Sequence, residues 1–312
     1  MYGTTMMTTA VWLLLYGATL AWLAPPILGR MTASGISPRM GAAAWIAAVA
    51  AALVTWLVAL ALAIGATADS VHTGAVVTLC LELFGFSDHT RMAGPIGLLA
   101  LIVAATLTLG LVALRVCRCI SRLRARSHEH AQAARIIGRP TGHPNVVMVE
   151  DDRPAAYCVV GRPNAIVVTS AALRSLSRSE LKAVLAHENA HISGRHHYIL
   201  MVLRAVALTL PRLPLFARAE RCVAELLEMC ADDTAARRVG TRPLLTGLIA
   251  LAGHQPVAYD GLAAAATAVV TRAQRLVTPT RSHVQWRHRI CLAAMICAVV
   301  AAPTLFQVLC HN

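Results

Sequence analysis

Residues 177–191 read Ser-Arg-Ser-Glu-Leu-Lys-Ala-Val-Leu-Ala-His-Glu-Asn-Ala-His, and this stretch sets the kind of domain that the chain can build. Ser177 is followed three residues later by Glu180, a pair that typically caps the start of a helix. The helix that follows would carry His187 and His191 four residues apart, so that both imidazoles lie on one face. The stretch therefore predicts a capped helix that presents two histidines to a common point.

The two histidines and the glutamate between them form the pattern His-Glu-x-x-His, which is typical of a catalytic zinc site. Two imidazoles at this spacing can bind one Zn²⁺ at about 2.0–2.1 Å. Glu188 can take a proton from a water molecule that the zinc makes acidic, and can later return it. The sequence therefore predicts a zinc-dependent hydrolase with one zinc per chain, His187 and His191 as ligands, and Glu188 as general base and acid.

Two candidates compete to be the third zinc ligand. Gly194 and His197 complete the string His-Glu-x-x-His-x-x-Gly-x-x-His, in which the glycine lets the chain turn so that the last histidine reaches the metal. Alternatively, Glu228 in the helical run 223–232 would complete a site of two histidines and one glutamate. Asp232 would lie on the same helical face as Glu228 and could accept the N–H of a ligand histidine. The residues alone leave both alternatives open.

A small sheet is predicted upstream of the histidine helix. The runs Asn145–Val149, Ala156–Val160 and Ala165–Thr169 are rich in β-branched residues, and Gly161–Asn164 between the last two is a turn sequence. The last run should therefore return beside the second as a hairpin. The strands at about Val146–Val149 and Ala165–Thr169 are the edge on which we expect an extended substrate to pair.

The composition of the 312-residue chain is that of a membrane protein. It is 57% hydrophobic and 14% charged, whereas soluble domains are roughly 45–50% apolar and about 25% charged. This balance excludes a purely cytosolic enzyme and a disordered chain. Four stretches reach the roughly 20 apolar residues that a helix needs to cross a bilayer. They run from about Met7 to Leu28, Ala42 to Ala66, Gly94 to Leu114 and Ile290 to Leu309.

The positions of the arginines predict the orientation, because loops rich in Lys and Arg stay in the cytoplasm. Arg30 and Arg39 lie in the first connection, whereas the second connection, residues 67–92, is net acidic. All other basic residues except Arg91 lie between Arg115 and Arg289. We therefore expect a multi-pass plasma-membrane protein with its N-terminus outside. The net charge of +13 then reflects this topology, and the basic surface of the large segment faces anionic lipid. No direct nucleic-acid binding is expected.

Three regions follow from this layout. Residues 1–116 should form three transmembrane helices with short loops, residues 117–285 a cytoplasmic zinc metallopeptidase domain, and residues 286–312 the fourth transmembrane helix with a short external tail. The expected fold is thus an α-helical membrane protein with a cytoplasmic α+β zincin-like domain. Residues 198–216 are apolar but contain two prolines and two arginines, so they are expected to lie against the bilayer or to pack on the site.

The sequence also offers roles for several other polar side chains. Arg275, His283 and His288 near the end of the domain are candidates for stabilising an oxyanion, with nothing to choose between them. His196 and His197 are expected to form a basic patch just past the histidine helix. Cys80 and Cys310 are the two cysteines expected outside, where a disulfide is permitted.

The residues also resemble a known family. The runs Ala156–Thr169 and Leu181–His191, followed by Glu228-x-x-Ala231-Asp232, resemble the integral-membrane metallopeptidases that include the HtpX heat-shock proteases and the CAAX prenyl proteases. Three spans before the catalytic domain and one after it resemble more specifically the BlaR/MecR antirepressor peptidases. In this resemblance Glu228 matches the family's glutamate ligand and Asp232 matches its aspartate, which favours Glu228 over His197.

The resemblance implies an endopeptidase that cleaves a cytoplasmic transcriptional repressor, or itself, in a signalling response. A housekeeping HtpX-type protease that clears damaged membrane proteins would share every site residue, and a non-enzymatic receptor that retains the fold is a third possibility. The antirepressor receptors carry an external penicillin-binding domain after the last span. This chain ends within a few residues of its last span, so direct reaction with a β-lactam is not expected.

Overall fold

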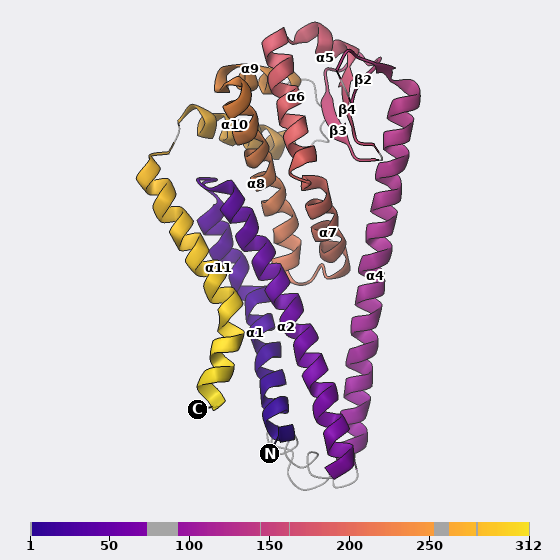
Figure 1. Cartoon of the computed structure of the whole chain (residues 1–312), viewed down its shortest axis with the longest axis vertical. Coiled ribbons are helices and arrows are strands. Elements are labelled where there is room, and N and C mark those ends of the chain that lie inside the picture. The colour runs from indigo at the N-terminus through magenta and orange to yellow at the C-terminus, as the bar shows by residue number, and fades with distance from the viewer. Residues whose placement is uncertain are drawn as a thin grey trace.

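The computed structural model describes residues 2–73, 93–143, 145–161, 163–252, 262–278 and 280–311. Long helices form a bundle, and a small sheet with several shorter helices lies at one end of it (Figure 1). Both chain termini lie at the opposite end of the bundle from the sheet. Cys80, one of the two cysteines expected outside, lies outside the described residues, so its permitted disulfide with Cys310 is not tested.

Four helices in the described residues are long and apolar enough to cross a membrane, as the sequence predicts. The helices are α1 (Tyr2–Thr32), α2 (Pro38–Thr73), α4 (Ala93–Ile137) and α11 (Ser282–His311). Their candidate spans are Thr5–Thr32, Pro38–Ala66, Ile102–Ile137 and Ser282–Leu305. The side of the membrane on which each connection lies stays a prediction.

Helix α4 continues through the predicted start of the cytoplasmic domain at residue 117. It is 45 residues long, about 68 Å at 1.5 Å per residue, whereas the hydrocarbon core of a bilayer is about 30 Å thick. Between Leu111 and Ile137 the sequence contains no glycine or proline that would interrupt it. The arginine-rich segment is therefore a helical extension of the third candidate span, and it carries the chain up to the sheet (Figure 1).

The sheet has four strands in the order β1-β2-β4-β3. The strands are β1 (Arg139–Pro140), β2 (Val146–Val149), β3 (Ala156–Val159) and β4 (Ala165–Thr169). The predicted hairpin is confirmed, because β3 pairs antiparallel with β4. Strand β4 also pairs in parallel with β2 and is buried throughout.

The prediction of the substrate-binding edge was wrong. Strand β4 has a partner on each side, and β2 lies between β1 and β4, so neither offers a full free edge. The two edge strands of the described sheet are β1, which has two residues, and β3, Ala156–Val159, which is the longer of the two. Strand alternation alone could not reveal this, because the order of strands in a sheet depends on how non-adjacent strands pair.

Shorter helices follow the sheet and carry the candidate site. They are α5 (Ser170–Ser175), α6 (Arg178–Ser193), α7 (His196–Thr209), α8 (Pro214–Val239), α9 (Thr241–Ala252) and α10 (Leu262–Val277). Helix α6 packs against α8, α9 and the edge strand β3. This packing places α6 between the sheet and the helices that follow it (Figure 1).

Residues 198–216 form parts of α7 and α8, which pack on the long helices rather than forming a fifth span. Helix α7 has 14 residues, about 21 Å, which is shorter than a bilayer core. Leu203 of α7 and Phe216 of α8 belong to the same buried cluster as Trp45 of α2. Phe216 also contacts Trp56 edge to face, with ring centroids 6.0 Å apart. One buried cluster therefore runs from α7 and α8 into the long helices α1, α2 and α11, whereas the sheet and α6 have a buried cluster of their own.

Candidate metal centre

Helix α6 begins with the predicted capping box. The backbone N–H of Ser177 donates to Glu180 Oε2 at 2.8 Å, and Ser177 Oγ accepts from the backbone N–H of Glu180 at 3.4 Å. Val184 and His187 lie on the buried side of the helix and are 1% and 4% exposed. The local sequence therefore starts the helix, and its apolar face turns the first histidine inwards.

His187 and His191 on α6 meet Glu228 on α8. Their Nε2 atoms lie 3.1 Å apart. Glu228 Oε2 lies 3.4 Å from His187 Nε2, and Glu228 Oε1 lies 3.3 Å from His191 Nε2. One ligand atom from each of the three residues can be chosen so that all lie within 4.8 Å of one another.

This donor set fits zinc. Nitrogen ligands at about 2.0–2.1 Å on two corners of a tetrahedron lie about 3.3 Å from each other, close to the spacing between the two Nε2 atoms. A carboxylate oxygen and two imidazole nitrogens all offer lone pairs, so a cation is the partner that suits the point on which they converge. Three protein ligands are typical of catalytic zinc sites, in which the fourth position stays open.

The competing third ligand, His197, does not join this group. Helix α6 ends at Ser193, Arg195 takes a left-handed conformation with φ of 52°, and α7 begins at His196. The His197 ring stacks on Tyr198, with ring centroids 3.9 Å apart. The geometry therefore favours Glu228 as the third ligand.

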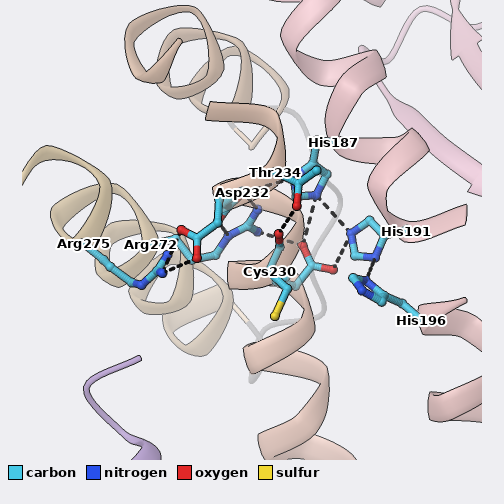
Figure 2. Close-up of polar contacts among 10 residues, drawn as sticks. His187, His191, His196, Cys230, Asp232, Thr234, Arg272 and Arg275 are labelled. Atoms are coloured by element: carbon cyan, nitrogen blue, oxygen red, sulfur yellow. Dashed lines mark hydrogen bonds and ion pairs between the residues drawn. The ribbon is translucent and has the colours of Figure 1, made fainter. Parts of the chain in front are cut away.

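His196 is in the site, contrary to the expectation of a basic patch. It is 8% exposed, and its Nδ1 lies 3.0 Å from Nδ1 of His191 (Figure 2). The sequence offered no signal that separates His196 from its neighbour His197, because the turn between α6 and α7 decides which ring points back to α6.

Asp232 lies where the sequence analysis predicts, behind His187. It is fully buried, and its Oδ1 lies 3.1 Å from His187 Nδ1. Burial alone would raise the pKa of Asp232, but the hydrogen bonds from Arg272 and the nearby His187 ring lower this pKa to about 2. Asp232 is therefore an anion that can hold the proton of His187 on Nδ1 and leave Nε2 facing Glu228.

Arg272 on α10 is a site residue that the sequence analysis missed. Its Nε and Nη2 donate to Asp232 Oδ2 and Oδ1, both at 2.7 Å, and its Nη1 lies 3.1 Å from Glu228 Oε2. One guanidinium thus joins the candidate ligand Glu228 to the aspartate behind His187. Figure 2 shows the pairing of Arg272 with Asp232. Burial would lower the pKa of Arg272, but the hydrogen bonds and charge of Asp232 raise it.

Among the described residues, the three that the sequence offered for stabilising an oxyanion form no hydrogen bond or ion pair with the candidate ligands. Arg275 donates to Asp233 and to the carbonyl of Gly35 in the α1–α2 connection. His288 Nε2 lies 2.8 Å from the carbonyl oxygen of Met31, and His283 is an exposed residue at the start of α11. Arg275 thus ties α10 to the α1–α2 connection, and His288 ties α11 to α1. Only the packing of α10 on α8 shows that Arg272, one turn before Arg275, is the arginine at the site.

Glu188 lies beside the edge strand. Its Oε2 accepts a hydrogen bond of 2.9 Å from the backbone N–H of Cys158 in β3. Burial raises the pKa of Glu188 to about 7, a value suited to a group that accepts and returns protons near neutral pH. The same surroundings raise the pKa of the Cys158 thiol to about 12, chiefly through burial and secondly through the Glu188 charge. Cys158 is therefore a neutral thiol rather than a nucleophile.

Comparisons with known proteins agree with this chemistry. Residues 121–252 match Peptidase family M48. A 69-residue stretch is 39% identical to a "Protease HtpX homolog" of Gemmatimonas aurantiaca and covers 22% of this chain and 23% of that protein. A 66-residue stretch is 35% identical to a "Protease HtpX homolog" of Thermoanaerobacter pseudethanolicus and covers 20% of this chain and 22% of that one. No solved structure matches the chain significantly.

These matches support a membrane metalloprotease of the HtpX group. The matched family region includes all five predicted site residues, whereas Arg272 lies beyond its end. The matched stretches span less than a quarter of the length of each of these two relatives. The match to M48 together with the His187, His191 and Glu228 group implies a metal, typically zinc.

Proposed function

We propose that this protein is a zinc-dependent endopeptidase of the membrane that hydrolyses peptide bonds in an extended segment of a protein substrate. The observation that carries the proposal is the hydrogen bond from Cys158 N–H to Glu188. Glu188, the proposed general base, therefore lies beside the edge strand β3, next in sequence to His187, whose Nε2 faces His191 and Glu228. Base, candidate ligands and a backbone edge for substrate therefore lie together.

His187, His191 and Glu228 would hold the zinc ion. When bound, zinc supplies Lewis acidity, which polarises a peptide carbonyl and makes water acidic near neutral pH. Glu188 takes a proton from the attacking water and transfers it to the leaving nitrogen, so that hydroxide ends on the carbonyl carbon and hydrogen on the amine. Asp232 keeps the proton of His187 on Nδ1, and Arg272 keeps Asp232 ionised.

The edge of β3 would bind the substrate backbone. Thr169 N–H donates to the carbonyl of Ala155, so antiparallel alternation turns the backbone groups of Tyr157 and Val159 towards β4. The backbone groups of Ala156 and Cys158 then point away from the sheet, as the bond to Glu188 confirms for Cys158. The N–H and C=O of Ala156 and the C=O of Cys158 can therefore pair with an extended peptide that adds as a further strand, while the Cys158 N–H stays with Glu188. Peptide segments that lack stable structure are therefore the expected substrates.

Two cellular roles fit this chemistry. The names of the matched relatives, protease HtpX homologues, favour an HtpX-type role in the turnover of membrane proteins. The layout of four candidate spans around the domain is the feature that fits an antirepressor that cleaves a cytoplasmic transcriptional repressor. Both roles place the domain in the cytoplasm, for which the arginine distribution is the argument. The two roles can be separated by comparing protein degradation in cells with and without the gene. Degradation of a neighbouring repressor only in cells that have the gene would support the antirepressor role. Degradation of misfolded membrane proteins only in those cells would support the HtpX-type role.

The proposed activity can be tested on the full chain purified in detergent. We expect it to cleave an unstructured protein such as β-casein, to lose this activity with a chelator, and to regain it with added zinc. Glu188→Gln is the matched control for contaminating proteases. Purified protein that binds zinc but cleaves no unstructured substrate would contradict the proposal and favour a receptor that retains the fold.

A further inference from the structure

We propose that His196 is a positioning residue for the zinc site: its Nδ1 accepts a hydrogen bond from His191 Nδ1–H and so keeps His191 Nε2 free to bind the metal. The inference rests on the proposed function, because it concerns the orientation of a candidate zinc ligand. It assigns a role to a histidine that lies outside the His-Glu-x-x-His pattern.

The two nitrogens of His191 face different partners. Its Nε2 lies 3.1 Å from His187 Nε2 and 3.3 Å from Glu228 Oε1, and is therefore the atom aimed at the metal position. Its Nδ1 faces the Nδ1 of His196 at 3.0 Å (Figure 2). One hydrogen bond between two ring nitrogens contains one proton.

The identity of the donor follows from metal binding. A neutral imidazole that offers the lone pair of Nε2 to zinc carries its proton on Nδ1. His191 Nδ1–H is therefore the donor, and His196 Nδ1 is the acceptor with its own proton on Nε2. A His196 ring that donated from Nδ1 would instead force the proton of His191 onto Nε2, where it would block the metal.

The turn between α6 and α7 is shaped around the His196 ring. Arg195 adopts φ of 52°, a left-handed conformation that is costly for a residue with a side chain. A side chain at Gly194 would collide with the ring of His196. His196 itself is 8% exposed and packs edge to face on His191, with ring centroids 4.9 Å apart and an interplanar angle of 87°. Both backbone features thus serve to seat this ring against the candidate ligand.

The two candidate histidine ligands consequently have different outer partners. His187 faces the carboxylate of Asp232, which Arg272 holds, whereas His191 faces a neutral ring. Histidine at position 196 therefore orients its ligand without adding a negative charge to a site that already contains Glu228 and Asp232. A side chain that places a neutral hydrogen-bond acceptor where His196 has its Nδ1 should therefore be able to replace His196.

The test compares three substitutions at position 196 in the full chain purified in detergent. Asparagine places its amide oxygen near the position of His196 Nδ1, glutamine places its amide about one bond further out, and leucine has no acceptor. Zinc affinity is measured by competition with a chelator, and the visible spectrum of the Co²⁺-loaded protein reports the ligand geometry. His197→Leu is the matched control, because that ring stacks on Tyr198 instead.

We expect His196→Leu to lower zinc affinity about 10–100-fold, the usual cost of losing an outer partner of a ligand histidine. His196→Gln should lower it similarly, whereas His196→Asn and His197→Leu should stay close to wild type in affinity and in Co²⁺ spectrum. If the leucine variant does not fold, the comparison of the asparagine and glutamine variants decides.

Wild-type affinity in His196→Leu would overturn the inference. Equal affinity in His196→Asn and His196→Gln would overturn it as well, because it would show a packing role rather than an acceptor. Since zinc binding is read without substrate, a wild-type protein that binds zinc and cleaves nothing would contradict the proposed function alone. A wild-type protein that binds no zinc would overturn both.

Discussion

Arg272 on α10 donates two parallel hydrogen bonds to Asp232 on α8, from Nε to Oδ2 and from Nη2 to Oδ1, each 2.7 Å long. Asp232 is fully buried and lies 3.1 Å from Nδ1 of His187. Three helices thus contribute to the orientation of one candidate ligand: α6 carries it, α8 carries the carboxylate behind it, and α10 neutralises that carboxylate.

Replacement of Arg272 should therefore weaken both the fold and the site. Arg272→Ala removes the guanidinium that pairs with the buried Asp232 charge and leaves only His187 beside it, and breaking a buried ion pair costs on the order of 3–5 kcal/mol of unfolding free energy. Zinc affinity should fall about 10–100-fold, and Arg272→Lys should be intermediate, because an ammonium cannot form the two parallel bonds. Denaturant unfolding and chelator competition measure the two effects. Arg242→Ala, an exposed arginine on α9, is the control, and an Arg272→Ala protein that matches it would contradict this account.

Asp232 and Arg272 should behave as one unit. Asp232→Ala is expected to lower zinc affinity about 10–100-fold, because His187 loses the acceptor that fixes its tautomer. The double variant Asp232→Ala with Arg272→Ala should lose less than the sum of the two single losses in free energy, since each change removes the same interaction. A double-mutant cycle on zinc affinity measures this coupling, and strict additivity would show that the two residues act separately.

Glu188→Gln should keep the zinc and the fold but lose about 10²–10⁴-fold in peptide hydrolysis. The amide oxygen can still accept from Cys158 N–H, yet it cannot take a proton from water. Zinc content, thermal unfolding and cleavage rate are measured on the same preparation. Cleavage at the wild-type rate would exclude Glu188 as the general base.

Glu228→Ala should lower zinc occupancy far more than His197→Ala. Glu228 has both carboxylate oxygens within 3.4 Å of the ligand nitrogens, whereas His197 stacks on Tyr198. Metal analysis after dialysis against a weak chelator compares the two variants. The reverse ranking would restore His197 as the third ligand.

The orientation in the membrane can be mapped with an impermeant thiol reagent on single-cysteine variants. The sheet and the C-terminus lie at opposite ends of the helix bundle (Figure 1), so the arginine distribution predicts a cytoplasmic sheet and an external C-terminus. A cysteine at Arg126, an exposed position on α4, should be protected in intact cells, and Cys310 should react. Reaction at position 126 from outside would rule out a cytoplasmic substrate and leave the zinc chemistry untouched.

Local patterns alone determined the elements that depend on neighbours in sequence. The capping box at Ser177 and Glu180, the shared face of His187 and His191, and the hairpin up to Thr169 each involve hydrogen bonds or periodicities within a few residues, and the structure confirms them. The four apolar helices belong to the same class, because the length of a span follows from the thickness of the bilayer.

Contacts between distant segments had to come from the tertiary structure. The helical spacing of Glu228 and Asp232 is visible in the sequence, but only the packing of α8 on α6 brings them to the histidines. Likewise, Arg272 and Arg275 share a helical face, and only the position of α10 assigns Arg272 to the site. The free edge of β3 and the inward turn of His196 also depend on pairing and on a turn. The type and spacing of residues determine which interactions their side chains can make. Which partners they meet depends on how whole faces of helices and strands pack against one another.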